Sequence, residues 1–155
     1  MTADEGQYAP KFLGRHGVTV ASDGRIRLPK RVIDQLKAHG VTRVWLCAVP
    51  GLKALIMCPD SHWGMWVKEA KRRFPCLRTQ DGVRTYLAPA EQVSPDQRGR
   101  IAVPPHLRDY AELRAGRIAV VVGMETHFEL WNRDALEVET ERRKTQLRRE
   151  RRASG

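Results

Sequence analysis

Two short apolar runs, one in each half of the chain, dominate its hydrophobic pattern. Residues 44–49 read Val-Trp-Leu-Cys-Ala-Val and residues 118–122 read Ile-Ala-Val-Val-Val. Runs of this length and β-branched composition are typical of buried strands. A turn and a second apolar run follow each of them, at 55–58 in the first half and at 128–131 in the second. The pattern therefore predicts one β-hairpin in each half.

Helices are predicted on both sides of each hairpin. Pro29 and Pro104 each open a short amphipathic segment before the hairpin, and proline is favoured at the first position of a helix. A polar cap begins a longer helix after the hairpin, at Asp60 or Ser61 in the first half and at Asn132 in the second.

The same order of elements occurs twice because the chain contains an internal repeat. The sequence Gly-Arg-Ile-Arg-Leu-Pro at 24–29 returns as Gly-Arg-Ile-Ala-Val-Pro at 99–104. A strand is expected before each copy of this motif, at 17–20 and at 90–93, followed by a turn rich in Asp, Ser, Pro and Gly. Each half thus runs strand, turn, strand, short helix, hairpin, helix.

These boundaries divide the chain into two units and two connecting or terminal segments. The first unit is expected at residues 12–74 and the second at 86–141, with a linker at 75–85 between them. Residues 142–155 form a basic tail with too few apolar side chains to bury a helix face. We expect this tail to be exposed or disordered.

The net charge of the chain indicates which class of partner it binds. The chain carries 28 Lys and Arg against 18 Asp and Glu, a formal net charge of +10. Such an excess favours polyanions, either nucleic acid or an anionic membrane surface. No run approaches the roughly 20 apolar residues that cross a bilayer, and the first ten residues are acidic and polar, unlike a signal peptide. We therefore expect a cytoplasmic protein that binds nucleic acid and no membrane.

The sequence offers no catalytic or metal chemistry. It contains no phosphate-binding glycine loop, spaced metal cluster or nucleophile motif, so we expect neither an enzyme nor a cofactor or small-molecule substrate. Cys58 and His62 lack the second ligand pair of a zinc site, and three widely spaced cysteines argue against a disulfide framework. The tryptophans are expected to pack in a core or interface rather than stack on bases, since Trp63 and Trp66 share a helix face with Val67.

At this level of detail the chain resembles the MraZ family, whose members carry two AbrB-like units with an Asp-x-x-Gly-Arg turn in each. The second copy carries the motif as Asp-Gln-Arg-Gly-Arg at 96–100, and residues 127–133 resemble the family's closing strand and helix cap. Phe12-Leu13-Gly14 matches its opening. The first copy departs from the pattern because Ala21 stands where the family has the acidic residue.

The resemblance implies an α+β fold of two pseudo-symmetric AbrB/SpoVT-like swapped-hairpin units that form a shared small β-barrel with flanking helices. It also implies a ring-shaped homo-oligomer and a nucleoid-associated transcriptional regulator. Such a regulator binds double-stranded DNA at upstream direct repeats and represses genes of the division and cell-wall cluster. Linked faces on successive repeats raise the effective local concentration of binding sites.

Candidate DNA contacts follow from the Gly-Arg motif. Arg25 and Arg100 are the expected base readers, because a planar guanidinium can donate to both acceptors on the major-groove edge of guanine. Gly24 and Gly99 let the backbone come close. The residues suited to phosphate contacts are Arg27, Lys30, Arg31, Arg98 and Arg108. Asp96 is expected to brace the second turn, and Asp23 to replace the missing carboxylate of the first in part.

Two alternatives keep this fold. One is an antitoxin-like AbrB regulator that binds a toxin partner as well as DNA, although fusion of two copies argues against it. The other is a ring-forming scaffold that binds protein alone. A titration with duplex DNA separates the scaffold from both regulators.

Overall fold

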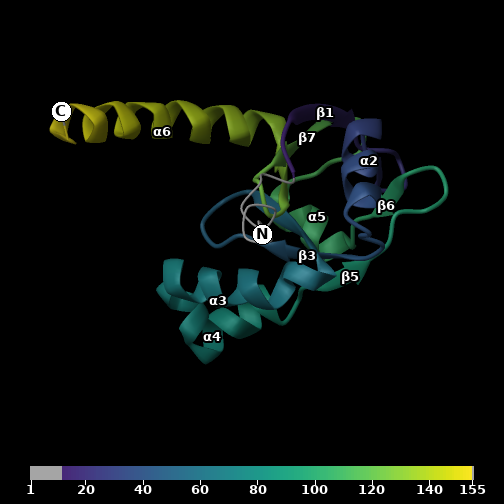
Figure 1. Ribbon diagram of the computed structural model, residues 1–155, viewed down its shortest axis with the longest axis horizontal. Helices are drawn as coiled ribbons and strands as arrows, with labels where there is room; N and C mark the ends of the chain where they lie inside the picture. The colour runs from purple at the N-terminus through teal and green to yellow at the C-terminus, as the bar shows by residue number, and fades with distance from the viewer. Residues whose placement is uncertain (1–11, 155) are drawn as a thin grey trace, which may run out of the picture.

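The computed structural model describes residues 12–154. The fold is α+β with antiparallel strands, as predicted (Figure 1). In the first half the elements are β1 (Arg15–Thr19), β2 (Arg25–Arg27), α2 (Lys30–Ala38), β3 (Val44–Ala48), β4 (Ala54–Pro59), η1 (Asp60–His62) and α3 (Trp63–Arg73). In the second half they are β5 (Glu91–Val93), β6 (Arg100–Ala102), α5 (Pro105–Ala111), β7 (Ile118–Gly123), β8 (Phe128–Asn132) and α6 (Arg133–Ser154). The predicted order of elements is therefore confirmed in both halves.

Six strands form one sheet in the order β1-β7-β8-β4-β3-β5, and β2 and β6 form a separate two-stranded ribbon. The order is unchanged when each strand is exchanged for its counterpart in the other half and the sequence of strands is reversed. β4 and β8 therefore meet at a pseudo-two-fold axis. The two halves share their strands, because β1 pairs with β7, β5 pairs with β3 and β2 pairs with β6.

The expected closed barrel is not formed among the described residues. β1 and β5 end the six-stranded sheet as edge strands, and the ribbon joins β1 only through a single bridge between Val20 and Ile26. One bridge is too little to continue the ladder from the sheet into the ribbon. In place of the predicted barrel the protein has an open sheet with the ribbon packed beside it.

A single apolar core joins both halves. It contains Ile26 and Leu36 from the first half and Ile101, Leu107 and Leu130 from the second, all buried. Because both halves contribute to this one cluster, packing as well as strand pairing makes the halves one folded body. A second, smaller cluster lies on the sheet face that α3 covers.

The segment expected as a linker, 75–85, is itself helical. It contains η2 (Pro75–Arg78), α4 (Gln80–Gly82) and the start of η3 (Val83–Leu87). Thr79 caps α4, because its hydroxyl oxygen accepts a hydrogen bond from the Gly82 N–H at 3.0 Å.

The basic tail is also helical, where disorder was one of two expectations. α6 runs to Ser154 and projects from the body along the long axis (Figure 1). Every described residue after 141 is exposed. Ion pairs within the helix, such as those of Glu139 with Arg142 and Arg143, stabilise it without burial.

The two predicted caps of the longer helices differ in outcome. Asn132 caps α6 as predicted, with its side-chain oxygen accepting from the Ala135 N–H at 3.0 Å. The cap predicted for α3 at Asp60 or Ser61 does not form, because the N-cap residue is His62 and no side chain caps this helix. The Asp60 carboxylate accepts instead from the Trp45 indole N–H at 2.9 Å and lies 3.8 Å from the Arg43 guanidinium. These two partners hold the carboxylate away from the helix N-terminus.

The tryptophans pack as predicted. Trp45, Trp63 and Trp66 form a stack with ring centroids 4.9 and 5.6 Å apart, and Trp131 is buried. This packing fixes α3 against the sheet.

Candidate nucleic-acid interface

The β2–β6 ribbon places arginines from both copies on one face. In its register Arg25 lies opposite Ala102, Ile26 opposite Ile101, and Arg27 opposite Arg100. Side chains alternate along a strand, so the three arginines share one face and the two isoleucines share the other. The isoleucines are fully buried and the arginines are accessible. Burial of the apolar face therefore directs the guanidinium groups outward.

A carboxylate braces the second turn. One oxygen of Asp96 accepts from the backbone N–H groups of Arg98 and Arg100, both at 2.9 Å, and the other accepts from the Arg100 Nε at 2.9 Å. These hydrogen bonds, the backbone bond from Arg100 first among them, hold the pKa of the Asp96 carboxyl below its usual value. Asp96 thus fixes both the turn and the direction of the Arg100 side chain.

The first turn has a weaker brace. Ala21 occupies the position of Asp96 and has no side-chain acceptor. Asp23 accepts from the Arg25 backbone N–H at 3.0 Å, and its other oxygen lies 3.7 Å from a terminal nitrogen of the Arg25 guanidinium.

Each glycine of the motif packs on a helix from the other half. Gly24 and Gly99 have φ of 81° and 74°, a left-handed conformation that favours glycine. A Cβ on Gly24 would overlap the Arg108 guanidinium of α5, and a Cβ on Gly99 would lie 3.3 Å from Ile33 of α2. The Arg108 Nε donates to the Val103 carbonyl at 3.0 Å, which holds the guanidinium in this position.

The remaining predicted contacts flank the ribbon. The Arg27 Nε donates to the Arg98 carbonyl at 3.4 Å, which ties β2 to the second turn. Lys30 and Arg31 begin α2 directly after β2, and the Lys30 ammonium lies 2.8 Å from the Asp34 carboxylate. Arg27, Lys30, Arg31 and Arg98 are exposed. In Figure 1 the ribbon and its turns lie at the opposite end of the long axis from the C-terminus of α6.

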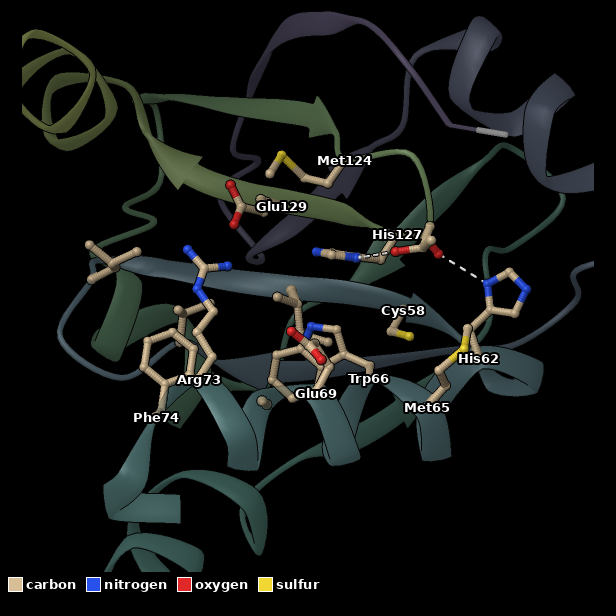
Figure 2. Close-up of a pocket in the computed structure, with 15 residues that line it drawn as sticks. Cys58, His62, Met65, Trp66, Glu69, Arg73, Phe74, Met124, His127 and Glu129 are labelled. Carbon is tan, nitrogen blue, oxygen red and sulfur yellow. Dashed lines mark hydrogen bonds between the residues drawn. The ribbon is translucent and has the colours of Figure 1, made fainter. Parts of the chain in front are cut away.

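A cavity of about 350 Å³ lies elsewhere, between α3 and the β4–β8 part of the sheet (Figure 2). Its lining combines apolar side chains such as Trp66 and Phe74 with Arg73, His127 and Glu129. Burial, with the nearby Arg73 cation and His62, lowers the pKa of His127 to about 4. Burial also raises the pKa of Glu129, whose carboxylate accepts from the Trp131 indole at 2.9 Å. No pattern in the sequence predicts this cavity, because the cavity depends on how α3 lies on the sheet.

Other chemistry is sparse in residues 12–154. Cys47 and Cys58 are buried, and burial raises the pKa of both thiols to about 12. Within this range no group of three or more His, Cys, Asp or Glu side chains is placed to hold a metal ion. The helices of the same range include none with the length and apolar composition of a membrane span.

Similarity to known proteins agrees with the repeated Gly-Arg motif. Residues 86–150 match the family model for the MraZ protein, which is described as antitoxin-like. A protein named Transcriptional regulator MraZ from Anaeromyxobacter sp. (strain Fw109-5) is 33% identical over 129 residues, covering 83% of this chain and 88% of the relative. The chain belongs to the MraZ family. This MraZ chain is also 34% identical to the regulator of that name from Paenarthrobacter aurescens (strain TC1) over 126 residues, covering 80% of this chain and 82% of the relative.

The match to the MraZ family model includes the braced second turn, whereas the departure at Ala21 lies outside it. Among solved structures, the solution structure of PHS018 from Pyrococcus horikoshii covers 77% of this MraZ chain and 87% of its own, at 14% identity and a TM-score of 0.33. That likeness is too distant to bear on the fold.

Proposed function

We propose that this MraZ chain is a transcriptional regulator that binds double-stranded DNA sequence-specifically through the β2–β6 ribbon and its two turns. The observation that carries the proposal is the accessible face shared by Arg25, Arg27 and Arg100 above the buried pair Ile26 and Ile101. A two-stranded ribbon fits the major groove of B-DNA, where base edges differ most. The +10 net charge adds attraction to phosphate.

The proposal gives the basic residues two roles. Arg25 and Arg100 donate to the O6 and N7 acceptors of guanine, and the tight turns at Gly24 and Gly99 bring the backbone toward the groove. Arg27, Lys30, Arg31, Arg98 and Arg108 contact phosphates, which fixes the register of the protein on the duplex.

In its full form the proposal describes an assembly. Residues 12–74 and 86–141 are two swapped-hairpin units within one body, and the strand exchange between the two halves supports this division. Several chains associate into a ring, so that repeated ribbons engage direct repeats upstream of division and cell-wall genes. Bound there, the protein represses transcription at the nucleoid in the cytoplasm. Binding of several ribbons to one duplex raises affinity without new contacts.

The test is a titration of the protein with two duplexes of equal length, the DNA upstream of its own gene and random DNA, at two salt concentrations. Arg25→Ala and Arg100→Ala are measured beside the parent. We expect the parent to prefer the upstream region, and both variants to lose part of this preference.

Two results would contradict the proposal. If each variant separates the repeat site from random DNA as well as the parent does, the assignment of base readers is wrong. If the parent binds no duplex DNA at either salt concentration, a protein-binding scaffold is favoured instead.

A further inference from the structure

The two Gly-Arg turns have the same backbone. In the first, the Ala21 N–H donates to the Arg25 carbonyl and the Gly24 N–H to the Ala21 carbonyl, both at 2.9 Å. In the second, the corresponding bonds from Asp96 to Arg100 and from Gly99 to Asp96 measure 2.8 and 2.9 Å. The loss of a carboxylate at position 21 therefore leaves the shape of the turn unchanged. Any difference in function must come from side chains.

The two arginines are held differently. Asp96 accepts from the Nε of Arg100, which restrains the side chain, and within residues 12–154 neither terminal nitrogen makes a hydrogen bond or ion pair. A guanidinium fixed in this way presents a planar fork, the geometry that a guanine edge requires. Arg25 has no partner on its Nε among the described residues, and Asp23 lies near one of its terminal nitrogens instead. A base that binds Arg25 must both order the side chain and displace this carboxylate.

The helices beneath the turns differ as well. Arg108 of α5 lies against the first turn, while its counterpart in the repeat, Ile33 of α2, lies against the second. The bond from the Arg108 Nε to the Val103 carbonyl fixes this second cation at the first turn. Arg108 is partly exposed, so an anion can approach this cation. Phosphate oxygens accept from many directions, which suits a pair of cations without a shared planar fork.

We infer that the two turns have different roles in DNA binding. Arg100 on the turn braced by Asp96 reads bases, whereas Arg25 and Arg108 at the weakly braced first turn bind phosphate with little regard to sequence. The inference rests on the proposed function and narrows it, because it moves Arg25 from the base-reading role given there to a phosphate role. Under this narrower assignment Arg25→Ala weakens binding on all sequences alike, and only Arg100→Ala loses sequence preference. Asp96 is a positioning residue that acts through Arg100. For each chain bound, the operator then contains one stringent block, a run of base pairs at which single substitutions weaken binding. Substitutions in the stretch that the first turn contacts have little effect.

The experiment begins with duplexes selected by the parent from a randomised pool. Every base pair of a selected duplex is then substituted singly, and the loss of affinity is measured at each position. We expect one block in which single substitutions weaken binding by about 10-fold or more, the scale of one bidentate contact. In Asp96→Ala the loss of affinity caused by single substitutions in this block should become smaller. Ala21→Asp should add a second block, because it supplies the missing brace to Arg25.

Arg108→Ile tests the phosphate role, because it installs the side chain found at the equivalent position of α2. It should weaken binding equally on all sequences and reduce the slope of log K against log salt concentration by about 0.9, the value for one phosphate contact. The positional profile should not change. Thermal unfolding of all three variants identifies any that fail to fold, and Ala21→Asp stays informative because it predicts a gain.

Three outcomes overturn the inference. The first is a parent profile with two equally stringent blocks, the second is an Asp96→Ala profile like that of the parent, and the third is an Ala21→Asp variant that folds and shows no second block. Failure of the proposed function is a different result, since Arg100→Ala would then retain the full preference of the parent for the selected duplex.

Discussion

Arg27 on β2 lies directly opposite Arg100 on β6, so the two copies of the repeat place two arginine side chains on the same accessible face of the ribbon. Like charges directly opposite each other in an antiparallel pair destabilise it. The paired isoleucines on the other face, both fully buried, offset this cost. A bound polyanion would neutralise the repulsion, so this arrangement is better suited to the DNA complex than to the free protein.

Replacement of Arg27 by glutamine separates its effect on the stability of the free protein from its effect on DNA binding. Loss of the like-charge pair should raise the free energy of unfolding by up to about 1 kcal/mol, and loss of the long hydrogen bond from the Arg27 Nε to the Arg98 carbonyl offsets part of this gain. Affinity for DNA should fall equally on all sequences, with the salt slope reduced by about 0.9. Urea unfolding and anisotropy titrations at several salt concentrations measure both. Arg84→Gln, which removes an exposed ion pair with Asp81 on α4, is the matched control and should not alter the salt slope. A loss of affinity confined to one sequence would show that Arg27 reads bases.

The isoleucine pair tests whether the two halves share one core. Ile26→Ala and Ile101→Ala each leave a cavity beneath the ribbon and should cost about 2–5 kcal/mol. Since both residues belong to the same buried cluster, each variant should show one cooperative transition, shifted to lower temperature. Calorimetry measures the transitions. Two separate transitions, with each variant moving only one of them, would show that the halves fold independently.

The cavity beneath α3 predicts a pH dependence of stability. The pKa of His127 is lowered to about 4, so between pH 6.5 and 4 the unfolded chain binds a proton that the folded chain does not. This histidine therefore makes the protein less stable as pH falls through that window. Glu129, whose pKa is raised, has the opposite sign.

The variant His127→Gln isolates the contribution of the histidine. Urea unfolding from pH 7 to pH 4 should show a smaller loss of stability than in the parent. Glu129, Arg73, His62 and Glu69 also face this cavity and remain in both proteins, so they cancel in the comparison. The same pH dependence in parent and variant would contradict the assignment.

Helix α6 predicts a contribution to DNA affinity without sequence preference. Its exposed basic residues project from the body, away from the ribbon (Figure 1). Deletion of residues 142–154 should weaken binding on all duplexes alike and lower the salt slope, while the ratio of affinities for the upstream region and random DNA stays constant. The deletion removes no buried residue, so thermal stability should change little. A fall in that ratio would assign α6 a role in sequence recognition.

Local patterns in the sequence predicted the strands, the hairpins and the helices that flank them, but not the helical turns at 75–87 or the continuation of α6 to Ser154. The pairing of distant segments could not be predicted from local patterns. The apolar runs at β3 and β7 and the proline starts of α2 and α5 are local signals. Within residues 12–154, β1 ends the sheet and a single bridge, Val20 to Ile26, joins it to the ribbon. This is a long-range property, and the barrel that the family resemblance implied was wrong there.

The candidate interface could be predicted as a set of residues but not as a geometry. The repeat identified Arg25 and Arg100, and the absent acid at position 21 was visible in the sequence. The contact of Arg108 with Gly24 was not, because it joins a helix of one half to a turn of the other. The charged lining of the cavity was missed for the same reason.

The central claim is that the Arg100 guanidinium reads a base in the major groove. Arg100→Lys tests it most directly, because lysine keeps the charge and loses the planar fork. Titrated against a selected duplex and a random one, the variant should bind the random duplex about as well as the parent and lose about 10-fold or more of the parent's preference for the selected duplex. A variant with the full preference of the parent would contradict the claim.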